Sequence, residues 1–283
     1  MKKNILLPTD FSRNAWNAAM YARELYKNEE CVFYLMNGFS NAYVALGDMN
    51  SSASESNFFD TAQETSLVSL EKALKRIMIK PAYPNHTYRT LAYFDLPLDA
   101  IKTAVDEKDI DVIVMGSKGE LDNVVNVFGS TTIAVMEKVR ICPVLAIPGD
   151  LTYKEPKEIV FPTNYKIHFK RRELQHLYEI SKLTNAAIRI LHVKDDIKLT
   201  VKQKNNKKLL ENCFDGLEYS YHELDNIGFL EGLQNFVQSR GSDMIALLNK
   251  KHALFNTIWI HPIVKDLGHD TEVPVLVMHE LKN

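Results

Sequence analysis

The feature that most constrains the fold is a repetition: the two halves of the chain carry the same short segments in the same order. Ile5-Leu6-Leu7-Pro8-Thr9-Asp10-Phe11 is matched by Ile159-Val160-Phe161-Pro162-Thr163-Asn164-Tyr165. Three more pairs follow in step: 35–37 with 190–192, 111–116 with 243–248, and 143–147 with 274–278. Ordered matches of this kind predict an internal duplication. We therefore expect domains over residues 1–150 and 151–283, joined by the polar segment 149–156, and each is long enough to bury its own core.

Each copy alternates apolar runs with stretches of helical periodicity. In the first copy the pattern predicts strands over 5–7, 31–36, 88–93, 111–115 and 143–147. It predicts helices, the first capped by Ser12, over 11–27, 58–80, 98–108 and 130–139, and a polar loop over 40–56. Strands alternating with helices predict an α/β fold with a parallel, doubly wound sheet in each domain. Such sheets bind ligands at the carboxyl ends of their strands.

A glycine-containing segment follows the strand expected over 111–115. It reads Met115-Gly116-Ser117-Lys118-Gly119, and Gly129-Ser130-Thr131 comes later at the start of an expected helix. Glycines after a buried strand let the backbone turn and approach a ligand closely. Unpaired N–H groups at a helix N-terminus bind anions, most often phosphate. The spacing matches neither the P-loop nor the Gly-x-Gly-x-x-Gly pattern of dinucleotide folds.

These motifs resemble the nucleotide-binding motif of the universal stress protein family. The resemblance rests on Pro8-Thr9-Asp10, on Gly116, Gly119 and Gly129-Ser130, and on the closing Pro143-Val144-Leu145 strand. The whole chain is similar to a tandem member with two fused domains. The resemblance implies a Rossmann-like fold of the adenine nucleotide α-hydrolase type. It also implies a cytoplasmic stress-response protein that binds ATP, with Mg²⁺, in its first domain and is regulatory rather than catalytic.

The resemblance also assigns roles to individual residues of the first copy. Asp10 contacts the nucleotide or its Mg²⁺, with Pro8 and Thr9 alongside; the alternative, which does not exclude this role, is that Asp10 caps the first helix. Asn37-Gly38 and Met115 lie near the adenine, and core packing is an equal alternative for Met115. The phosphate loop comprises Gly116, Ser117, Lys118, Gly119, Gly129, Ser130 and Thr131. A solvated loop position is as good an interpretation for Lys118 as a phosphate contact.

The second copy has lost these features. Asn164 replaces the carboxylate of Asp10, Leu248 stands where Gly116 stood, and Lys250-Lys251-His252 follow in place of a glycine turn. Phe255, Trp259 and Ile260 add bulk, so we expect no ATP in the usual position there. His252, His261, His269 and His279 lack the short spacing of a metal motif and are interpreted as scattered surface and loop residues. The alternative is that the basic residues and nearby aromatics bind an acidic or amphiphilic ligand. The lysine-rich stretch 198–208 is interpreted as a solvated helix face.

Composition limits the partners. A net charge of −2 gives no reason to expect nucleic acid or an anionic membrane. Three widely separated cysteines fit a reducing cytoplasm. No grouping of nucleophile, base and acid is evident, so binding without turnover is the leading hypothesis. A non-nucleotide interaction or sensing module and a slow ATPase are the alternatives. The closing strands of both copies are expected to pair, giving an intramolecular pseudo-dimer, and a homodimer of the full chain stays open.

Overall fold

The structure is a computed structural model that describes residues 2–40, 55–117, 129–149, 151–194, 198–250 and 273–280. Strands of the first half are β1 (Lys3–Pro8), β2 (Cys31–Phe39), β3 (His86–Phe94), β4 (Val112–Gly116) and β5 (Val144–Ile147). Its helices are α1 (Arg13–Leu25), α3 (Glu55–Met78), α4 (Pro97–Glu107) and α5 (Ser130–Lys138). None of the described helices is long and apolar enough to cross a lipid bilayer.

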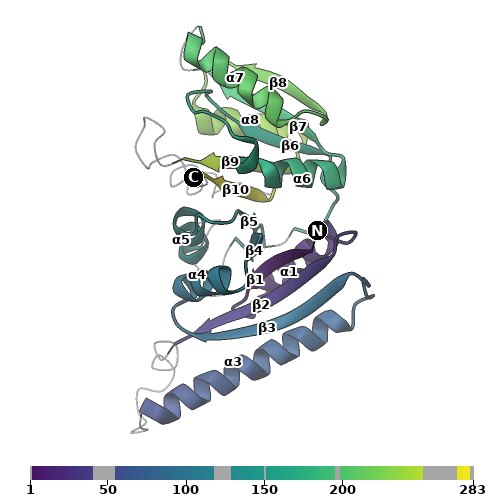
Figure 1. Ribbon diagram of the computed structural model, residues 1–283, viewed down its shortest axis with the longest axis vertical. Coiled ribbons are helices and arrows are strands. Elements are labelled where there is room, and N and C mark those ends of the chain that lie inside the picture. The colour runs from purple at the N-terminus through teal and green to yellow at the C-terminus, as the bar shows by residue number, and fades with distance from the viewer. Residues whose placement is uncertain are drawn as a thin grey trace.

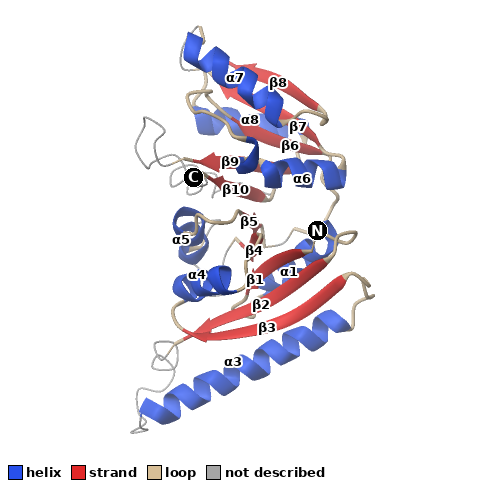
Figure 2. Ribbon diagram, in the orientation of Figure 1, coloured by secondary structure: helices blue, strands red, loops and turns tan. Residues whose placement is uncertain are grey.

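The second half repeats this alternation. Its strands are β6 (Glu158–Pro162), β7 (Ala187–Val193), β8 (Tyr219–Leu224), β9 (Met244–Asn249) and β10 (Val275–His279). Its helices are α6 (Gln175–Thr184), α7 (Val201–Cys213) and α8 (Phe229–Arg240), and a short 3-10 helix, η1 (Arg171–Glu173), precedes α6. Strands and helices alternate in both halves (Figures 1 and 2).

All ten strands form one sheet in the order β3-β2-β1-β4-β5-β10-β9-β6-β7-β8. Within each half the neighbours are parallel, as the sequence predicts. The halves meet where β5 and β10 run antiparallel, with Leu145 opposite Leu276. The order is symmetric about the β5–β10 pair, because each strand of the first half has its equivalent at the mirrored position of the second. This is expected for two copies of one unit related by an approximate twofold axis. The prediction that the closing strands of the two copies pair is confirmed.

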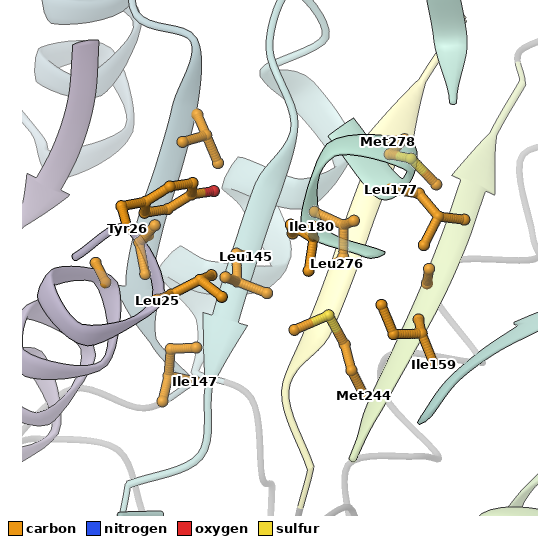
Figure 3. Packing of buried hydrophobic residues seen from close by; sticks show 14 of the residues in the cluster. Leu25, Tyr26, Leu145, Ile147, Ile159, Leu177, Ile180, Met244, Leu276 and Met278 are labelled. Atoms are coloured by element: carbon orange, nitrogen blue, oxygen red, sulfur yellow. The ribbon is translucent and has the colours of Figure 1, made fainter. Parts of the chain in front are cut away.

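Helices cover both faces of the sheet and bury its two apolar surfaces. One core contains residues of α1, α3, α6 and α7, and the other contains residues of α4, α5 and α8. Both cores continue across the β5–β10 junction. Leu145 and Leu276 belong to the first, where Leu276 lies beside Ile180 of α6 (Figure 3), and Val144 and Val277 belong to the second. Strand residues alternate between the cores: Ile5 and Leu7 belong to the first and Leu6 to the second. This alternation explains why Ile5, Leu6 and Leu7 are all apolar, since a strand covered on both faces has no polar side there.

The duplication extends to individual hydrogen bonds at the start of the strands. The Asp111 carboxylate accepts from the Asn4 N–H at 2.7 Å, tying the residue before β4 to β1. In the second half, the Asp243 carboxylate accepts from the Glu158 N–H at 3.1 Å and from the Lys157 N–H at 2.8 Å. A buried strand needs such partners for its first backbone groups. These aspartates are therefore structural in both copies.

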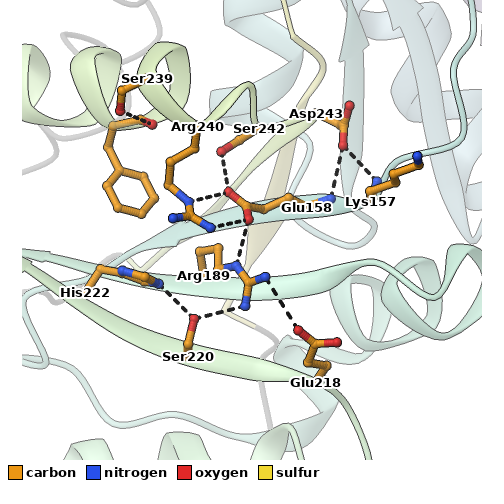
Figure 4. Close-up of polar contacts among 11 residues, drawn as sticks. Lys157, Glu158, Arg189, Glu218, Ser220, His222, Ser239, Arg240, Ser242 and Asp243 are labelled. Carbon is orange, nitrogen blue, oxygen red and sulfur yellow. Dashed lines mark hydrogen bonds and ion pairs between the residues drawn. The ribbon is translucent and has the colours of Figure 1, made fainter.

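The amino end of β6 carries a charged network that has no counterpart at Asn4. The Glu158 carboxylate accepts from Arg189 Nε at 2.7 Å, from Arg240 at 2.7 Å and from Ser242 Oγ at 2.8 Å (Figure 4). Arg189 also donates to Ser220 Oγ at 3.0 Å. Burial on its own would raise the pKa of Glu158, but the hydrogen bonds from its three partners outweigh it and lower the pKa to about 2.

Two predictions about side-chain environment need correction. The stretch 198–208 enters α7, but Gln203 and Asn206 are buried, so this segment is not a uniformly solvated face. His279 belongs to β10 and is 3% exposed, so it is not a surface or loop histidine. His252, His261 and His269 lie outside the described residues, as does nearly all of the polar stretch 40–56.

Candidate functional site

A cavity of about 710 Å³ opens at the carboxyl ends of β1, β2 and β4. Its volume lies within the range of small-molecule sites. The structure brings together nine of the residues that the sequence selects, and they line the cavity: Pro8, Thr9, Asp10, Asn37, Gly38, Met115, Gly116, Ser130 and Thr131. Ser117 and Gly129 are not part of the described lining, and Lys118 and Gly119 lie outside the described residues.

The turn after β1 places Asp10 at the mouth of the cavity. Phe11 adopts a left-handed backbone with φ 65°, and its N–H donates to Thr9 Oγ1 at 2.9 Å. The Asp10 carboxylate accepts from the Ser12 N–H at 3.1 Å. Ser12 is the N-cap of α1, since its hydroxyl accepts from the Ala15 N–H at 3.2 Å. Asp10 therefore braces the turn but is not the cap, and its side chain is exposed toward solvent.

The amino end of α5 faces the same cavity. Gly129 is the N-cap, with φ −66° and ψ 157°, and Ser130 and Thr131 begin the helix. Thr132 is buried, and its hydroxyl donates to the Gly116 carbonyl at 3.0 Å, which fixes the helix start against the end of β4. The first N–H groups of a helix lack intrahelical partners and form its positive end. The Gly129 N–H is already used, since it donates to the Ser117 carbonyl at 2.6 Å.

Gly116 was expected to let the backbone approach a ligand, but in the structure it lets β4 approach the backbone of α1. A Cβ on Gly116 would lie 3.0 Å from the carbonyl carbon and 3.1 Å from the carbonyl oxygen of Asn14 in α1. The glycine therefore lets β4 end directly against the first turn of α1. A larger residue here would displace that helix, so substitution of Gly116 tests packing and ligand binding together.

Asn37 is a positioning residue. Its Nδ2 donates to the Thr9 carbonyl at 2.7 Å, and its Oδ1 accepts from Ser66 Oγ at 2.8 Å. The side chain thus joins the ends of β1 and β2 to α3. Gly38 packs against the start of α4, where a Cβ would approach Ala100 Cβ to 3.0 Å.

Sequence reasoning missed one whole wall of the cavity. Four hydroxyl residues of α3 line it, namely Thr61, Thr65, Ser66 and Ser69. Their spacing of three to four residues places them on one face of the helix, and this was the available signal. The apolar part of the lining comes from Met36, Phe39, Ile101 and Met115. Ser40 also lines the cavity, and its hydroxyl is buried with no hydrogen-bond partner among the described residues.

The same turn recurs after β6, but its surroundings differ. The Tyr165 N–H donates to Thr163 Oγ1 at 3.1 Å, and Tyr165 again has a positive φ, 56°. His192 Nδ1 lies 2.9 Å from the Thr163 carbonyl oxygen, as the Asn37 amide lies beside Thr9. Tyr165 is 1% exposed, whereas Phe11 is 39% exposed. The second half thus keeps the backbone of the site and turns its aromatic side chain into the core.

A buried ion pair lies at the end of β9. Lys250 Nζ lies 2.6 Å from Glu173 Oε2, and the two side chains are 7% and 0% exposed. The same ammonium donates to the His168 carbonyl. Lys250 was expected in a basic loop that could bind an acidic ligand, but its charge is satisfied within the chain. Lys251 and His252 lie outside the described residues.

Metal binding and thiol chemistry find little support in the described residues. No group of three or more His, Cys, Asp or Glu side chains among them is arranged to hold a metal ion. Cys31, Cys142 and Cys213 are free and buried. Burial raises the pKa of the Cys31 and Cys142 thiols to about 12, so both stay protonated at neutral pH.

Comparison with known proteins identifies the family. A model of the universal stress protein family matches residues 1–148, so the chain belongs to the universal stress protein family. A universal stress protein from Archaeoglobus fulgidus matches with a TM-score of 0.69 at 15% identity, over 98% of this chain and 96% of that chain. A functionally unknown protein from Pseudomonas aeruginosa matches with a TM-score of 0.59 at 12% identity, over 98% and 92%. These likenesses establish a shared fold across both halves.

One further match is a universal stress protein solved in complex with cAMP. It has a TM-score of 0.38 at 16% identity and covers 52% of this chain and 98% of that chain. At this TM-score the likeness says nothing about what this chain binds. No protein of curated function matches the chain.

Proposed function

We propose that the first domain, residues 1–150, binds ATP in the cavity beside α5, and that the second domain, residues 151–283, is a degenerate partner. The observation that carries this proposal is the convergence of Asp10 and the amino end of α5 on one cavity of about 710 Å³. A helix N-terminus favours phosphate, and the apolar wall formed by Met36, Ile101 and Met115 suits a purine base.

The lining also fits the polar parts of a nucleotide. The hydroxyl groups of Thr61, Thr65 and Ser69 line the cavity along α3 and offer oxygen acceptors to a ribose, although Thr65 Oγ1 already donates to the Thr61 carbonyl at 2.8 Å. The Ser40 hydroxyl, which has no partner among the described residues, supports a bound polar ligand. Mg²⁺ is held in many nucleotide sites by one or two carboxylates together with phosphate oxygens and waters. Asp10 would supply the carboxylate.

Binding is favoured over turnover. Among the described residues that line the cavity, Asp10 is the single ionisable side chain. General acid–base catalysis needs a positioned group with a tuned pKa, and usually a partner that tunes it. We therefore propose a regulatory role in a stress response rather than catalysis. A cytoplasmic location agrees with the three free, buried thiols.

Calorimetric titration of the full chain with ATP and Mg²⁺ tests the proposal. Asp10→Asn should weaken binding roughly ten- to a hundredfold, because a charged partner typically contributes about 1.5–3 kcal/mol. The substitution recreates the Asn164 of the second half, whose turn keeps the same geometry, so the fold should persist. Asp215→Asn, at an exposed position in the second half, is the control and should bind like the wild type.

Two results would contradict the proposal. If the wild-type chain gives no binding heat with ATP and Mg²⁺, the cavity serves another ligand. If Asp10→Asn binds as tightly as the control, ATP does not contact Asp10, and the placement of the nucleotide is wrong.

A further inference from the structure

A second cavity, of about 170 Å³, lies where the two halves meet. The antiparallel pairing of β5 and β10 creates it, because it places the amino end of one half of the sheet beside the carboxyl end of the other. Asp111 and Arg140 line it from the first half, and Glu173, His176 and His279 line it from the second. This cavity is separate from the one beside α5, with which it shares no lining residue.

His279 is the unexplained group in this cavity. The residue is 3% exposed, and neither ring nitrogen has a hydrogen-bond partner among the described residues. Burial, with a further contribution from the positive charge of Arg140, lowers the pKa of His279 to about 3. The imidazole is therefore neutral at neutral pH and offers one N–H donor and one acceptor nitrogen. Leaving the N–H unpaired in a buried position is unfavourable, and an acceptor atom of a bound molecule would satisfy it.

Glu173 supplies a second unsatisfied group. Its side chain is fully buried, and Oε2 is paired with Lys250 at 2.6 Å. Oε1 is buried as well and has no hydrogen-bond partner among the described residues. Because Lys250 neutralises the carboxylate, the cavity wall presents a hydrogen-bond acceptor without a large repulsion of anions.

Arg140 supplies positive charge at the same cavity. Its Nε donates to the Glu137 carbonyl at 3.3 Å, and burial lowers the pKa of the guanidinium while Glu280 opposes this effect. The other carboxylates of the lining have partners of their own. Glu179 is paired with Lys3 at 2.6 Å, and Asp111 accepts from the Asn4 N–H at 2.7 Å. The lining also contains Lys3 and Arg172, so its basic side chains balance its carboxylates and an anion is not strongly repelled.

We propose that the junction cavity binds a small oxyanion that also carries a hydrogen-bond donor, such as a hydroxycarboxylate or hydrogen phosphate. Its anionic oxygens accept from Arg140 and from the imidazole N–H of His279, and its hydroxyl donates to Glu173 Oε1. A cavity of about 170 Å³ is smaller than the roughly 300–1,000 Å³ of drug-sized sites, so a nucleotide is excluded. The walls come from both halves, and the ligand therefore bridges them.

The direct test is an NMR titration of the histidine imidazole nitrogens of the full chain. L-lactate and inorganic phosphate are the probes, propionate lacks the hydroxyl donor, and 1,2-propanediol lacks the charge. We expect lactate, phosphate or both to shift the His279 signals in a saturable way. Propionate should bind about tenfold more weakly or worse, and the diol should leave the signals unchanged. A response to only one of the two probes shows whether the cavity binds a hydroxycarboxylate or hydrogen phosphate.

Variants locate the site in a second measurement, calorimetry with the same probes. His279→Leu and Arg140→Gln should abolish the heat of binding, whereas His168→Gln, at an exposed histidine outside the lining, should not change it. His279→Leu should also raise the melting temperature of the free protein, because it removes an unpaired buried polar group.

Several outcomes would overturn the proposal. His279 signals that do not move at concentrations well above about 1 mM of either probe would show that the cavity holds only water. Equal responses to lactate and propionate would show that the ligand hydroxyl does not donate to Glu173 Oε1. Equal heats for the wild type and His279→Leu would place the ligand elsewhere.

Discussion

The two halves build the same turn after their first strand, yet they use it differently. In both, a threonine hydroxyl accepts from the N–H two residues on, at 2.9 Å for Thr9 and 3.1 Å for Thr163. In both, an aromatic residue takes a positive φ. The first half leaves a cavity beside this turn, whereas the second packs Tyr165 against His192, with ring centroids 5.1 Å apart. Backbone hydrogen bonding preserves the turn in both copies, and the side chains around it decide whether its aromatic residue is exposed or packed in the core.

The connection that follows the turn differs as well. In the first half, α1 begins at Arg13 with Ser12 as its cap. In the second half, η1 is inserted before α6 and brings Glu173 to the ammonium of Lys250. Near the corresponding strand ends, the described residues of the second half make contacts inside the protein, Glu173 with Lys250 and Tyr165 with His192. If the second half is the degenerate partner that we propose, its site changed through such internal contacts while the fold stayed the same.

The largest expected effect comes from separating the halves. Residues 1–149 alone would expose the edge of β5, where Val144, Leu145 and Ala146 are fully buried in the whole chain. An uncovered apolar edge strand pairs with another such edge. We expect this fragment to dimerise or aggregate, because it has lost the strand that covers β5 in the full chain. Size-exclusion chromatography with light scattering, run on both proteins at the same concentration, measures this association. A well-behaved monomer of the fragment would show that β10 is not needed to cover β5.

The next effect concerns the ion pair that distinguishes the second half. Lys250→Met removes the partner of a fully buried carboxylate, and breaking a buried pair from one side typically costs about 3–5 kcal/mol. Urea denaturation should show this loss in the free energy of unfolding. The double variant Lys250→Met/Glu173→Leu should recover part of it, because no buried charge is left uncompensated.

An exposed pair provides the matched control. Lys27 lies 3.0 Å from Glu155, with side chains 37% and 52% exposed, so Lys27→Met should cost less than about 1 kcal/mol. Equal losses for Lys27→Met and Lys250→Met would mean that solvent reaches the Lys250–Glu173 pair.

Periodicity and the repeat predicted the sheet well. The buried centre of β1 and the whole of β4 are apolar runs that mark them as strands, and the duplicated landmarks predicted their counterparts β6 and β9 in the second half. The pairing of β5 with β10 also followed, because two copies with the same exposed edge can satisfy each other. Boundaries were less accurate: β2 runs on to Phe39 and β3 spans His86–Phe94, since strand ends depend on neighbours that a local pattern does not reveal.

The candidate site was predictable where a motif marks it and not where tertiary contacts build it. Asp10 and Ser130 carry local signals, a strand end and a helix start, and both line the cavity. The hydroxyl face of α3 became part of the site only because α3 packs beside β2, and no local pattern fixes that placement. Glu173 and His279 illustrate the same limit, since their burial arises where distant segments meet at the junction of the halves.

The smallest of these effects concerns the amino ends of the first strands, where Glu158 of the second half stands in place of Asn4. The pKa of Glu158 is lowered to about 2 from its ordinary value of 4.5, so the network stabilises the fold fully above pH 4.5. That stabilisation is lost as the pH falls from 4.5 toward 2. Glu158→Gln should therefore cost about 2 kcal/mol at pH 7, a value reduced by the partial exposure of Arg240.

The pH dependence separates this network from simple packing. In urea denaturation, the difference between the wild type and Glu158→Gln should shrink as the pH falls from 5 to 3, because the wild-type carboxylate then begins to lose its charge advantage. Glu218→Gln is the matched control: Glu218 lies 3.5 Å from the same Arg189, but its side chain is 73% exposed, so little stability should be lost. A difference for Glu158→Gln that stays constant with pH would show that the side chain contributes through its shape and neutral hydrogen bonds. The negative charge of Glu158 would then contribute nothing to the stability of the fold.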